Sequence, residues 1–479
     1  MTDRATPTLL WLRRDLRLAD HPGWAAARAG GGPVIPVFVL DPTTQARLGA
    51  APAWRLGEAL AAYAKQLEAR GSRLILRRGP ALACLRQLVA QTGAKRVVWS
   101  RLYDADARER DATVKAALKG DGIEAVSVNA HLLFEPWEVA TKTGGFYKVY
   151  TPFWKAVRGA SLDAPVSEPG DLAPPERWPD SDRLADLNLG AGLRRGTEIV
   201  RRHAIIGEAA ARERLDWFLD GPVARYKADR DRMDIDATSK LAQCLSLGEI
   251  SARTLWQAGW RAFEGASGAA AAGAECFVSE LVWREFAYHL LYHTPQIEAR
   301  NWRPEWDAFP WAADSEAAEL WRRGRTGIAA VDAAMREMYV TGTMHNRGRM
   351  IVASFLTKHL LVDWRAGEAW FRDCLIDWDP AANAMGWQWS AGTGPDATPY
   401  FRVFNPDSQA ERFDPARAYR DRWIAEGRSR PHPDALSFFE AIPRAWGLSP
   451  EQAYPAPVIG LKEGRERALE AYRKLREAV

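Results

Sequence analysis

Cysteine is scarce in this chain of 479 residues, which contains only four: Cys84, Cys244, Cys276 and Cys374. No two of them show the CxxC or CxxH spacing of a zinc or iron–sulfur site, and their scatter argues against a disulfide framework. We therefore expect neither a bound metal nor a disulfide-stabilised secreted fold.

Long hydrophobic runs are also missing. The sequence has no stretch of 18 apolar residues, so we expect no membrane-spanning helix. The N-terminal segment reaches Arg13 and Arg14 before any apolar run of signal-peptide length, which predicts a cytoplasmic protein.

A glycine fingerprint for a nicotinamide dinucleotide is absent as well. The glycines at 30–32 do not form GxGxxG after a strand, so a nicotinamide dehydrogenase is the weakest of the functions considered. The net charge of +4 is too small to identify a partner. Arginines gathered on one face would still suit nucleic acid.

Tryptophan, by contrast, is abundant: there are 22, and fifteen of them follow residue 200. An indole buries a large apolar surface and needs a partner for its N–H group, so we expect most of them to pack in the core. A role for a few in stacking or electron transfer is the sharper alternative.

Short apolar and β-branched runs alternate with helical stretches in the first 130 residues. The runs are TLLWLR, PVIPVFVLD, SRLILRRG, KRVVWSR and IEAVSVNAHLLF, and the helical stretches lie near 54–70, 81–93 and 105–119. This alternation predicts an α/β domain over 1–130, with a doubly wound parallel sheet and helices on both faces.

The rest of the chain divides at a segment rich in proline, acidic and small residues. This composition is densest at 160–190, and we expect an interdomain linker over 131–195. Strand signals vanish from about 195 onward and helical periods dominate, which predicts a larger all-α domain over 196–479.

The stretch DWDPAANAMGWQW (377–389) places acids, an amide and two indoles close together. Trp387 and Trp389 are two residues apart, so they cannot share one face of a helix. The simplest interpretation is a helix junction whose tryptophans fill the core. The acids and the amide leave a ligand site open.

The stretch ECFVSELVWREFAYHLLYH (275–293) combines unlike side chains on one helical face. Glu280, Trp283, Arg284 and Ala287 follow helical spacing and lie on the same side. A carboxylate beside an indole and a guanidinium is unusual for a solvent-facing surface. An exposed stripe with a Glu–Arg ion pair is nevertheless the alternative to a binding site.

The stretch TGTMHNRGRMIVASFL (341–356) has the same character. Asn346 and Met350 are i, i+4 neighbours, while Arg347 and Arg349 project to either side. Gly348 costs a helix about 1 kcal/mol relative to alanine, which suggests that another group approaches closely there.

The stretch MDIDATSKLAQCLSLGEISAR (233–253) reads as a loop that enters a helix at Thr238, Ser239 and Lys240. Hydroxyl and backbone N–H groups at a helix N-terminus make an anion site, and the lysine adds charge. An ordinary N-cap without a ligand is the alternative.

Six segments together resemble one known family: LLWLRRDLRLADHPGW, TSKLAQCLSLGEIS, ELVWREFAYHLL, GIAAVDAAMREM, MHNRGRMIVASFL and DWDPAANAMGWQWSAGTGPDATPYFRVFNP. They are closely similar to the DNA photolyase/cryptochrome flavoproteins. The likeness spans essentially the whole chain and is densest from 226 to 406. It implies an N-terminal α/β domain and a C-terminal helical domain that holds FAD in a bent shape.

The resemblance assigns the positions around the flavin. It implies that Asn383 faces the N5 edge of the isoalloxazine, that Asp377 pairs with Arg349, and that Asp379 lies near the polar edge of the ring. An amide suits N5 because it accepts from N5–H and tolerates several redox states. The positions that match the family's diphosphate-binding segment are Tyr226, Thr238, Ser239, Lys240 and Leu241.

The resemblance also implies an electron-transfer chain of three tryptophans. Trp387 should begin the chain beside the flavin, Trp364 is the expected middle member, and Trp311 the surface member. Trp306 competes with Trp311 for the last place.

Substrate contacts are implied at a further set of positions. In enzymes that repair cyclobutane pyrimidine dimers, a glutamate, an asparagine and a methionine contact the lesion, and Glu280, Asn346 and Met350 match them. The (6-4) photoproduct enzymes have histidines at the last two places, so (6-4) repair is not expected here. Trp283 and Trp389 should stack on the extruded base, an arrangement that photolyases exemplify among base-flipping proteins.

A neutral amide and a protonated carboxyl suit the carbonyl edges of two fused pyrimidines, and burial would raise the pKa of Glu280. The expected partner is ultraviolet-damaged DNA, held through its phosphates by a monomer of this protein. The arginines that match family positions at the cavity rim are Arg230, Arg284, Arg347 and Arg402.

Two questions stay open at the level of sequence. The same fold also serves cryptochromes, which are photoreceptors without repair activity, although the compact C-terminal segment lacks the long polar extension that many of them carry. An antenna pigment is the second question. The segment SRLYDADARERD (100–111) resembles a folate-contacting region, with Asp104 where others have glutamate, and implies 5,10-methenyltetrahydrofolate or alternatively a deazaflavin.

Overall fold

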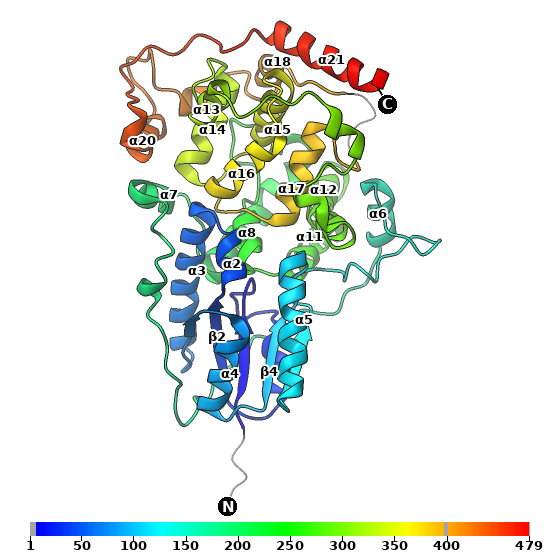
Figure 1. The fold of residues 1–479 in the computed structure, drawn as a ribbon, viewed down its shortest axis with the longest axis vertical. Coiled ribbons are helices and arrows are strands. Elements are labelled where there is room, and N and C mark those ends of the chain that lie inside the picture. The colour runs from blue at the N-terminus through cyan, green and yellow to red at the C-terminus, as the bar shows by residue number, and fades with distance from the viewer. Residues whose placement is uncertain (1–5, 397–400, 479) are drawn as a thin grey trace, which may run out of the picture.

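A computed structural model describes residues 6–396 and 401–478 of the chain (Figure 1). A parallel sheet with flanking helices forms the lower half of the view, and a larger helical part forms the upper half. The expected division into an α/β part followed by an α part is confirmed.

Five parallel strands form the sheet in the order β3-β2-β1-β4-β5. They are β1 (Thr8–Leu12), β2 (Val34–Leu40), β3 (Ile75–Arg78), β4 (Arg96–Ser100) and β5 (Glu124–Val128). Each of the five predicted runs supplies one strand. Strands β2 and β3 follow β1 on one side, whereas β4 and β5 lie on its other side, so the strand order switches between β1 and β4. In such folds ligands bind at the carboxyl ends of the strands beside this switch.

Helices cover both faces of the sheet because side chains alternate along each strand. Leu10 and Leu12 of β1 pack with α1 (Pro22–Arg28) and α3 (Ala50–Glu68). Leu9 and Trp11 face α4 (Ala81–Thr92) and α5 (Ala105–Gly120) on the other side. The helices predicted near 54–70, 81–93 and 105–119 are confirmed as α3, α4 and α5.

The chain between the two parts contains little regular structure from 158 to 183. It begins after β5 and includes α6 (Tyr150–Val157), which packs against the helical part, then η1 (Leu184–Leu187) and η2 (Arg194–Gly196). The irregular stretch coincides with the segment rich in proline and acid.

The upper half is built almost wholly from helices. Apart from one isolated bridge between Ala312 and Val362, the described residues after 195 form no β-structure. Its elements are α7 (Thr197–Arg201), α8 (Glu208–Asp220), η3 (Pro222–Arg225), α9 (Tyr226–Asp229), α10 (Ala242–Leu247), α11 (Ala252–Glu264), α12 (Gly268–His293), η4 (Pro295–Glu298), η5 (Pro304–Ala308), α13 (Glu316–Arg322), α14 (Ala329–Thr341), α15 (Asn346–Ser354), the π-helix η6 (Phe355–His359), α16 (Trp364–Cys374), α17 (Pro380–Ala391), α18 (Pro406–Phe413), α19 (Ala418–Trp423), α20 (Pro433–Ala441), η7 (Arg444–Trp446) and α21 (Leu461–Ala478).

Helix α12 is the centre of this helical part. It is buried along most of its second half and packs against α9, α11 and α17. Gly259 of α11 allows a close approach to α12, since a Cβ atom there would lie 2.6 Å from Cγ2 of Val278. The two halves of the molecule are joined by a fully buried ion pair between Arg55 of α3 and Glu249.

None of the described helices is both long enough and apolar enough to cross a membrane. Within the described ranges, no cluster of three or more histidine, cysteine, aspartate or glutamate side chains has the arrangement of a metal site.

Candidate functional site

Glu280 of α12 forms an ion pair with Arg230, which directly follows α9. Both side chains are partly exposed, at 31% and 20%, so the pair lies at a rim rather than in the core. Burial raises the pKa of Glu280 above its ordinary value, and the Arg230 guanidinium opposes this shift. The carboxyl group is thus held in one place while remaining accessible from solvent.

Asn346 and Met350 face the same way at the start of α15. The Asn346 side-chain nitrogen lies 3.9 Å from the Met350 sulfur, as their helical spacing predicts. Asn346 is exposed and Met350 half-buried. Gly348 lies on the opposite side, where a Cβ atom would come within 3.1 Å of Ala334, and this allows α15 to approach α14 closely.

A second ion pair brings α15 beside the Glu280 rim. Arg347 binds Asp231 across 2.5 Å, and Asp231 is the neighbour of Arg230, the partner of Glu280. The Arg347 guanidinium also lies 4.3 Å above the ring of Phe413. The expected lesion contacts on α12 and α15 are therefore joined through adjacent residues of the loop after α9.

Helix α17 separates its two tryptophans as predicted. Trp387 is 2% exposed and Trp389 is half-buried. Asp379 caps the start of the helix and accepts hydrogen bonds from the backbone N–H groups of Ala381 and Ala382. The helix-junction interpretation and a ligand-lining role are thus compatible.

The polar groups expected around the flavin lie on α15, on α17 and in the short segment just before α17. Arg349 donates to Asp377 across 2.6 Å, which is the predicted pairing. The other carboxylate oxygen of Asp377 is buried without a hydrogen-bond partner within the described residues. A buried unpaired oxygen costs free energy unless a bound molecule supplies a donor, so this position fits a polar ligand.

Asn383 has a defined orientation. Its side-chain nitrogen donates to the Glu368 carboxylate at 2.9 Å and to the Glu368 backbone oxygen at 3.3 Å. Among the residues described, no group donates to its amide oxygen, which is therefore available as an acceptor. Glu368 has no counterpart in the sequence predictions; it lies one turn after Trp364 on α16.

The segment expected to bind diphosphate differs from its predicted conformation. The helix begins at Ala242 rather than at Thr238 because Lys240 adopts a left-handed backbone conformation, with φ at 55°. Arg214 holds the carbonyl groups of Thr238 and Ser239, and Lys240 pairs with Asp236 at 3.0 Å.

The N–H groups of this loop are free to bind an anion. In the described part of the chain, the backbone N–H groups of Thr238, Ser239 and Lys240 have no hydrogen-bond partner. Tyr226 and Leu241 are buried. Successive unpaired N–H groups form a concave anion site, so the loop fits a phosphate-bearing ligand without a helix N-terminus.

The three tryptophans of the expected electron chain lie on contiguous elements. The six-membered ring of Trp387 presses on Gly367, one helical turn after Trp364. Trp364 is fully buried and donates to Asn301 at 2.8 Å. Trp311 precedes Ala312, whose N–H donates to the Leu361 carbonyl shortly before Trp364.

Solvent exposure favours Trp311 over Trp306 as the surface member of the electron-transfer chain. Trp306 is 4% exposed, whereas Trp311 is half-buried, and their ring centroids lie 6.3 Å apart. A terminal donor must be reached by solvent or an external reductant, and Trp311 meets this condition better.

The two remaining arginines expected to contact DNA, Arg402 and Arg284, differ in their exposure to solvent. Arg402 is exposed beside the ring of Phe404. Arg284 is turned into the protein instead: its side chain is 12% exposed, pairs with Glu285 at 2.9 Å and donates to the His131 carbonyl. This geometry argues against Arg284 as a phosphate contact, because its donors are already engaged with α12 and with the chain after β5.

A hydrogen-bonded network that the sequence did not suggest lies behind Arg284. The Tyr288 hydroxyl donates to Asp379 and lies 2.9 Å from a ring nitrogen of His131. Arg14 donates to the same hydroxyl at 3.1 Å. This network connects the start of α17 to the α/β part. No local sequence pattern signals it, since the residues that it joins are 91 or more positions apart.

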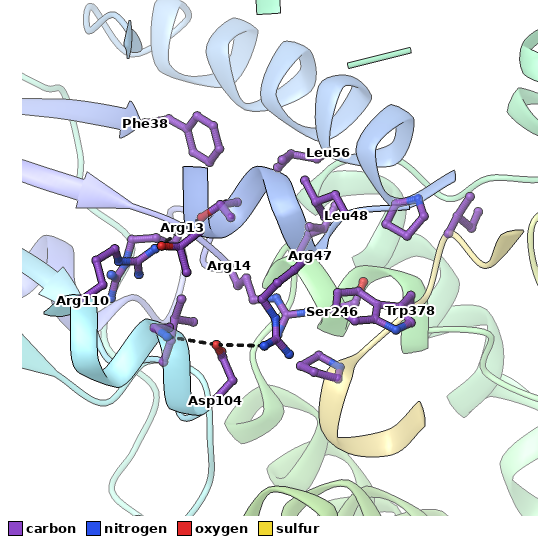
Figure 2. Close-up of a pocket in the computed structure, with 18 residues that line it drawn as sticks. Arg13, Arg14, Phe38, Arg47, Leu48, Leu56, Asp104, Arg110, Ser246 and Trp378 are labelled. Atoms are coloured by element: carbon purple, nitrogen blue, oxygen red, sulfur yellow. Dashed lines mark hydrogen bonds and ion pairs between the residues drawn. The ribbon is translucent and has the colours of Figure 1, made fainter. Parts of the chain in front are cut away.

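Figure 2 shows a cavity between the two halves of the molecule, at the carboxyl ends of β1 and β4. Asp104 caps α5 at its edge and lies 3.8 Å from Arg47, the last residue of α2 (Pro42–Arg47). Three more arginines, Arg13, Arg14 and Arg110, line the cavity. Its apolar wall includes Phe38, Leu48, Leu56 and Trp378. Cationic groups beside an apolar wall suit a planar anionic ligand.

Comparison with known proteins adds an independent line of evidence. Residues 8–171 match the family described as DNA photolyase, and residues 277–474 match the FAD binding domain of DNA photolyase. The chain is 43% identical to a deoxyribodipyrimidine photo-lyase of Agrobacterium fabrum over 98% of each chain. It is 34% identical to Cryptochrome-1 of Arabidopsis thaliana, over 97% of this chain and 70% of that protein.

A solved structure agrees with these sequence relatives. A bacterial class III photolyase from Agrobacterium tumefaciens superposes with a TM-score of 0.91 and 41% identity, covering 100% of this chain and 99% of the other.

Proposed function

The chain belongs to the DNA photolyase family and carries its FAD-binding domain, and we propose that it repairs cyclobutane pyrimidine dimers in DNA under blue light. The observation that carries this proposal is the rim formed by Glu280, Arg230, Asn346 and Met350. It offers a carboxyl group, a guanidinium, an amide and a soft apolar wall together. These groups suit two fused pyrimidine rings better than an unmodified base.

FAD is the cofactor, and when bound and reduced it supplies an electron to the lesion upon excitation by light. Residues of this chain hold it: the free N–H groups at 238–240 suit its diphosphate, and the unpaired oxygen of Asp377 suits a donor of the cofactor. The free amide oxygen of Asn383 suits a protonated ring nitrogen. Trp387, Trp364 and Trp311 supply electrons from the surface to restore the reduced state.

The lesion becomes more negative when it receives the electron, so donors around it stabilise the reacting state. The Asn346 amide supplies one donor. Glu280 supplies another when it is protonated, and Arg230 compensates its charge when it is not. Trp283 and Trp389 stack on the extruded bases and keep water away, while Met350 fills the remaining side.

DNA is bound chiefly through its backbone in this proposal. Arg230, Arg347 and Arg402 contact phosphates near the rim, and Arg284 instead fixes α12 against the α/β part. Such contacts do not depend on base sequence, as a lesion sensor requires. We further propose a cytoplasmic monomer, because one rim accepts one extruded lesion.

The cavity of Figure 2 is the proposed site of an antenna pigment. Its arginines and apolar wall suit the aromatic rings and negative charge of 5,10-methenyltetrahydrofolate or of a deazaflavin. Asp104 belongs to the edge of this site through its contact with Arg47. The similarity to a class III photolyase makes that subclass the proposed assignment.

A cryptochrome-type photoreceptor is the competing function, since the plant cryptochrome shares 34% identity with this chain. Repair of ultraviolet-irradiated oligothymidine by the purified, chemically reduced protein separates the two. Recovery of thymine absorbance in blue light but not in the dark supports the enzyme. A protein that binds FAD and photoreduces it but restores no thymine would be a photoreceptor.

A further inference from the structure

Tyr150 lies flat against Trp283, with ring centroids 3.6 Å apart and planes inclined by 8°. Tyr150 is the first residue of α6 and Trp283 lies in the middle of α12, so the stack joins two elements that are distant in sequence. Of the two rings, Tyr150 is 8% exposed and Trp283 remains partly accessible. One face of the indole is therefore already covered before any substrate arrives.

Hydrogen bonds fix the tyrosine in this position. Its hydroxyl donates to the backbone oxygen of Ser279 at 2.6 Å and lies 2.7 Å from the Ser279 hydroxyl. Ser279 is one helical turn before Trp283 on α12. The tyrosine is thus anchored at one end by Ser279 and stacked at the other on the indole that it orients.

Phe286 completes the enclosure on the inner side. Its ring lies edge-on to both Tyr150 and Trp283, with centroids 5.9 Å from each. Edge-to-face and offset-stacked contacts restrict ring rotation beyond what simple burial does. Trp283 therefore has one defined orientation, and its uncovered side is the one left for a ligand.

Glu280 places this aromatic cluster at the lesion rim. It precedes Trp283 by three residues on α12. Burial raises the pKa of the Tyr150 hydroxyl; the hydrogen bond to Ser279 opposes this shift, and the nearby Glu280 carboxylate adds to it. The tyrosine therefore keeps its proton and remains a donor to Ser279. The Tyr150–Ser279 bond is thus unaffected by pH in the range where DNA is intact.

We propose that Tyr150 is a positioning residue for base stacking: it holds the Trp283 indole in the orientation that receives the extruded pyrimidine dimer. This inference rests on the proposed repair function. A pre-oriented indole loses less conformational freedom when a base stacks on it, so binding of the lesion is tighter. Unmodified duplex DNA does not enter the rim and gains nothing from this orientation.

The test compares Tyr150→Leu with Tyr150→Phe in the full-length protein with FAD bound. Leucine keeps an apolar side chain but removes the stack, whereas phenylalanine keeps the stack and removes the hydroxyl. Tyr147→Leu is the matched control. Tyr147 lies three residues before Tyr150 and packs on Phe153 and His289. FAD content and melting temperature establish that each variant is folded, and Tyr150→Met replaces the leucine variant should that one lose FAD.

Dissociation constants are measured for a dimer-containing oligonucleotide and for its undamaged counterpart. We expect Tyr150→Leu to bind the dimer about ten-fold more weakly, with unchanged affinity for undamaged DNA and unchanged repair yield per absorbed photon once bound. Tyr150→Phe should retain most of the preference for dimer-containing over undamaged DNA, and Tyr147→Leu should leave this preference unchanged.

Equal losses for damaged and undamaged DNA, or no loss in Tyr150→Leu, would overturn the positioning role while leaving the repair function standing. Absence of any preference for the dimer in the unsubstituted protein would overturn both.

Discussion

Arg349 of α15 donates a hydrogen bond of 2.6 Å to Asp377, which lies just before α17. The pair connects the two helices that line the proposed flavin site, and it leaves the second Asp377 oxygen buried and unpaired. An oxygen in this state gains more from a bound donor than an exposed one does. The arrangement therefore couples the packing of α15 and α17 to binding of the cofactor.

Asp377→Asn should consequently weaken FAD binding. The change keeps the shape of the side chain but replaces a charged acceptor, and charge-assisted bonds contribute about 1.5–3 kcal/mol, so we expect affinity to fall about ten- to hundred-fold. Fluorescence titration of the apoprotein with FAD measures the effect. Asp363→Asn serves as a control, since Asp363 caps the start of α16 and pairs with Arg365. Unaltered FAD affinity in Asp377→Asn would remove this carboxylate from the site.

Photoreduction should depend on Trp311 more than on Trp306. Trp311→Phe is expected to reduce light-driven flavin reduction to near zero in the presence of an external thiol, because the exposed end of the chain is lost. Trp306→Phe, which alters a buried ring 6.3 Å away, should retain most of the rate. Absorbance of the flavin during blue illumination gives the rates.

Chemically reduced Trp311→Phe should still repair dimers at the normal yield, since the chain only restores the reduced cofactor. A repair defect in that sample would show that Trp311 acts elsewhere.

Binding of damaged DNA should weaken with salt in a way that identifies Arg402. A phosphate contact releases counterions, so Arg402→Ala should lower the slope of log affinity against log salt by about 1. Arg183→Ala provides the comparison, because Arg183 is 80% exposed and lies in the segment between the two parts. Identical salt slopes for the two variants would exclude Arg402 from the DNA interface.

Acid should destabilise the protein through His289. Burial, together with the neighbouring His293, lowers its pKa to about 4, and its ring accepts the Tyr147 N–H at 3.0 Å. Because the folded state favours neutral imidazole, the contribution is fully present above the ordinary pKa near 6.5 and is lost as pH falls towards 4. The loss at pH 4 amounts to roughly 3 kcal/mol.

Urea unfolding of the wild type and of His289→Gln at several pH values between 7 and 4 isolates this contribution. The glutamine variant keeps an acceptor for Tyr147 but does not titrate, so its free energy of unfolding should depend less steeply on pH. Parallel pH profiles for the two proteins would contradict the assignment.

Periodicity and local composition predicted the two-part fold correctly. The five strands and the helices α3, α4 and α5 follow from alternation of short apolar runs with helical stretches, since that pattern records which faces are buried. Spacing along one helix was equally informative: the Asn346–Met350 contact and the opposite directions of Trp387 and Trp389 follow from the α-helical period.

Periodicity and local composition did not predict the contacts between residues that are far apart in sequence. Tyr150 and Trp283 are far apart in sequence, as are Tyr288 and His131, and no local period relates the members of either pair. The start of the helix after Lys240 was predicted wrongly because residue type alone did not reveal the left-handed backbone at that position. Arg284 had the expected helical face, but the chain after β5 occupies its donors.

The central claim is light-driven reversal of a pyrimidine dimer at the Glu280 rim. The most direct measurement is chromatography of an oligonucleotide with one defined dimer after illumination of the reduced protein, beside a dark sample, a (6-4) photoproduct and the Glu280→Ala variant. We predict restored thymines only for the dimer, only in light, and with a clearly lower yield in Glu280→Ala. A dimer left intact by the illuminated, FAD-loaded protein would contradict the account, and full activity of Glu280→Ala would remove the carboxyl group from the reaction.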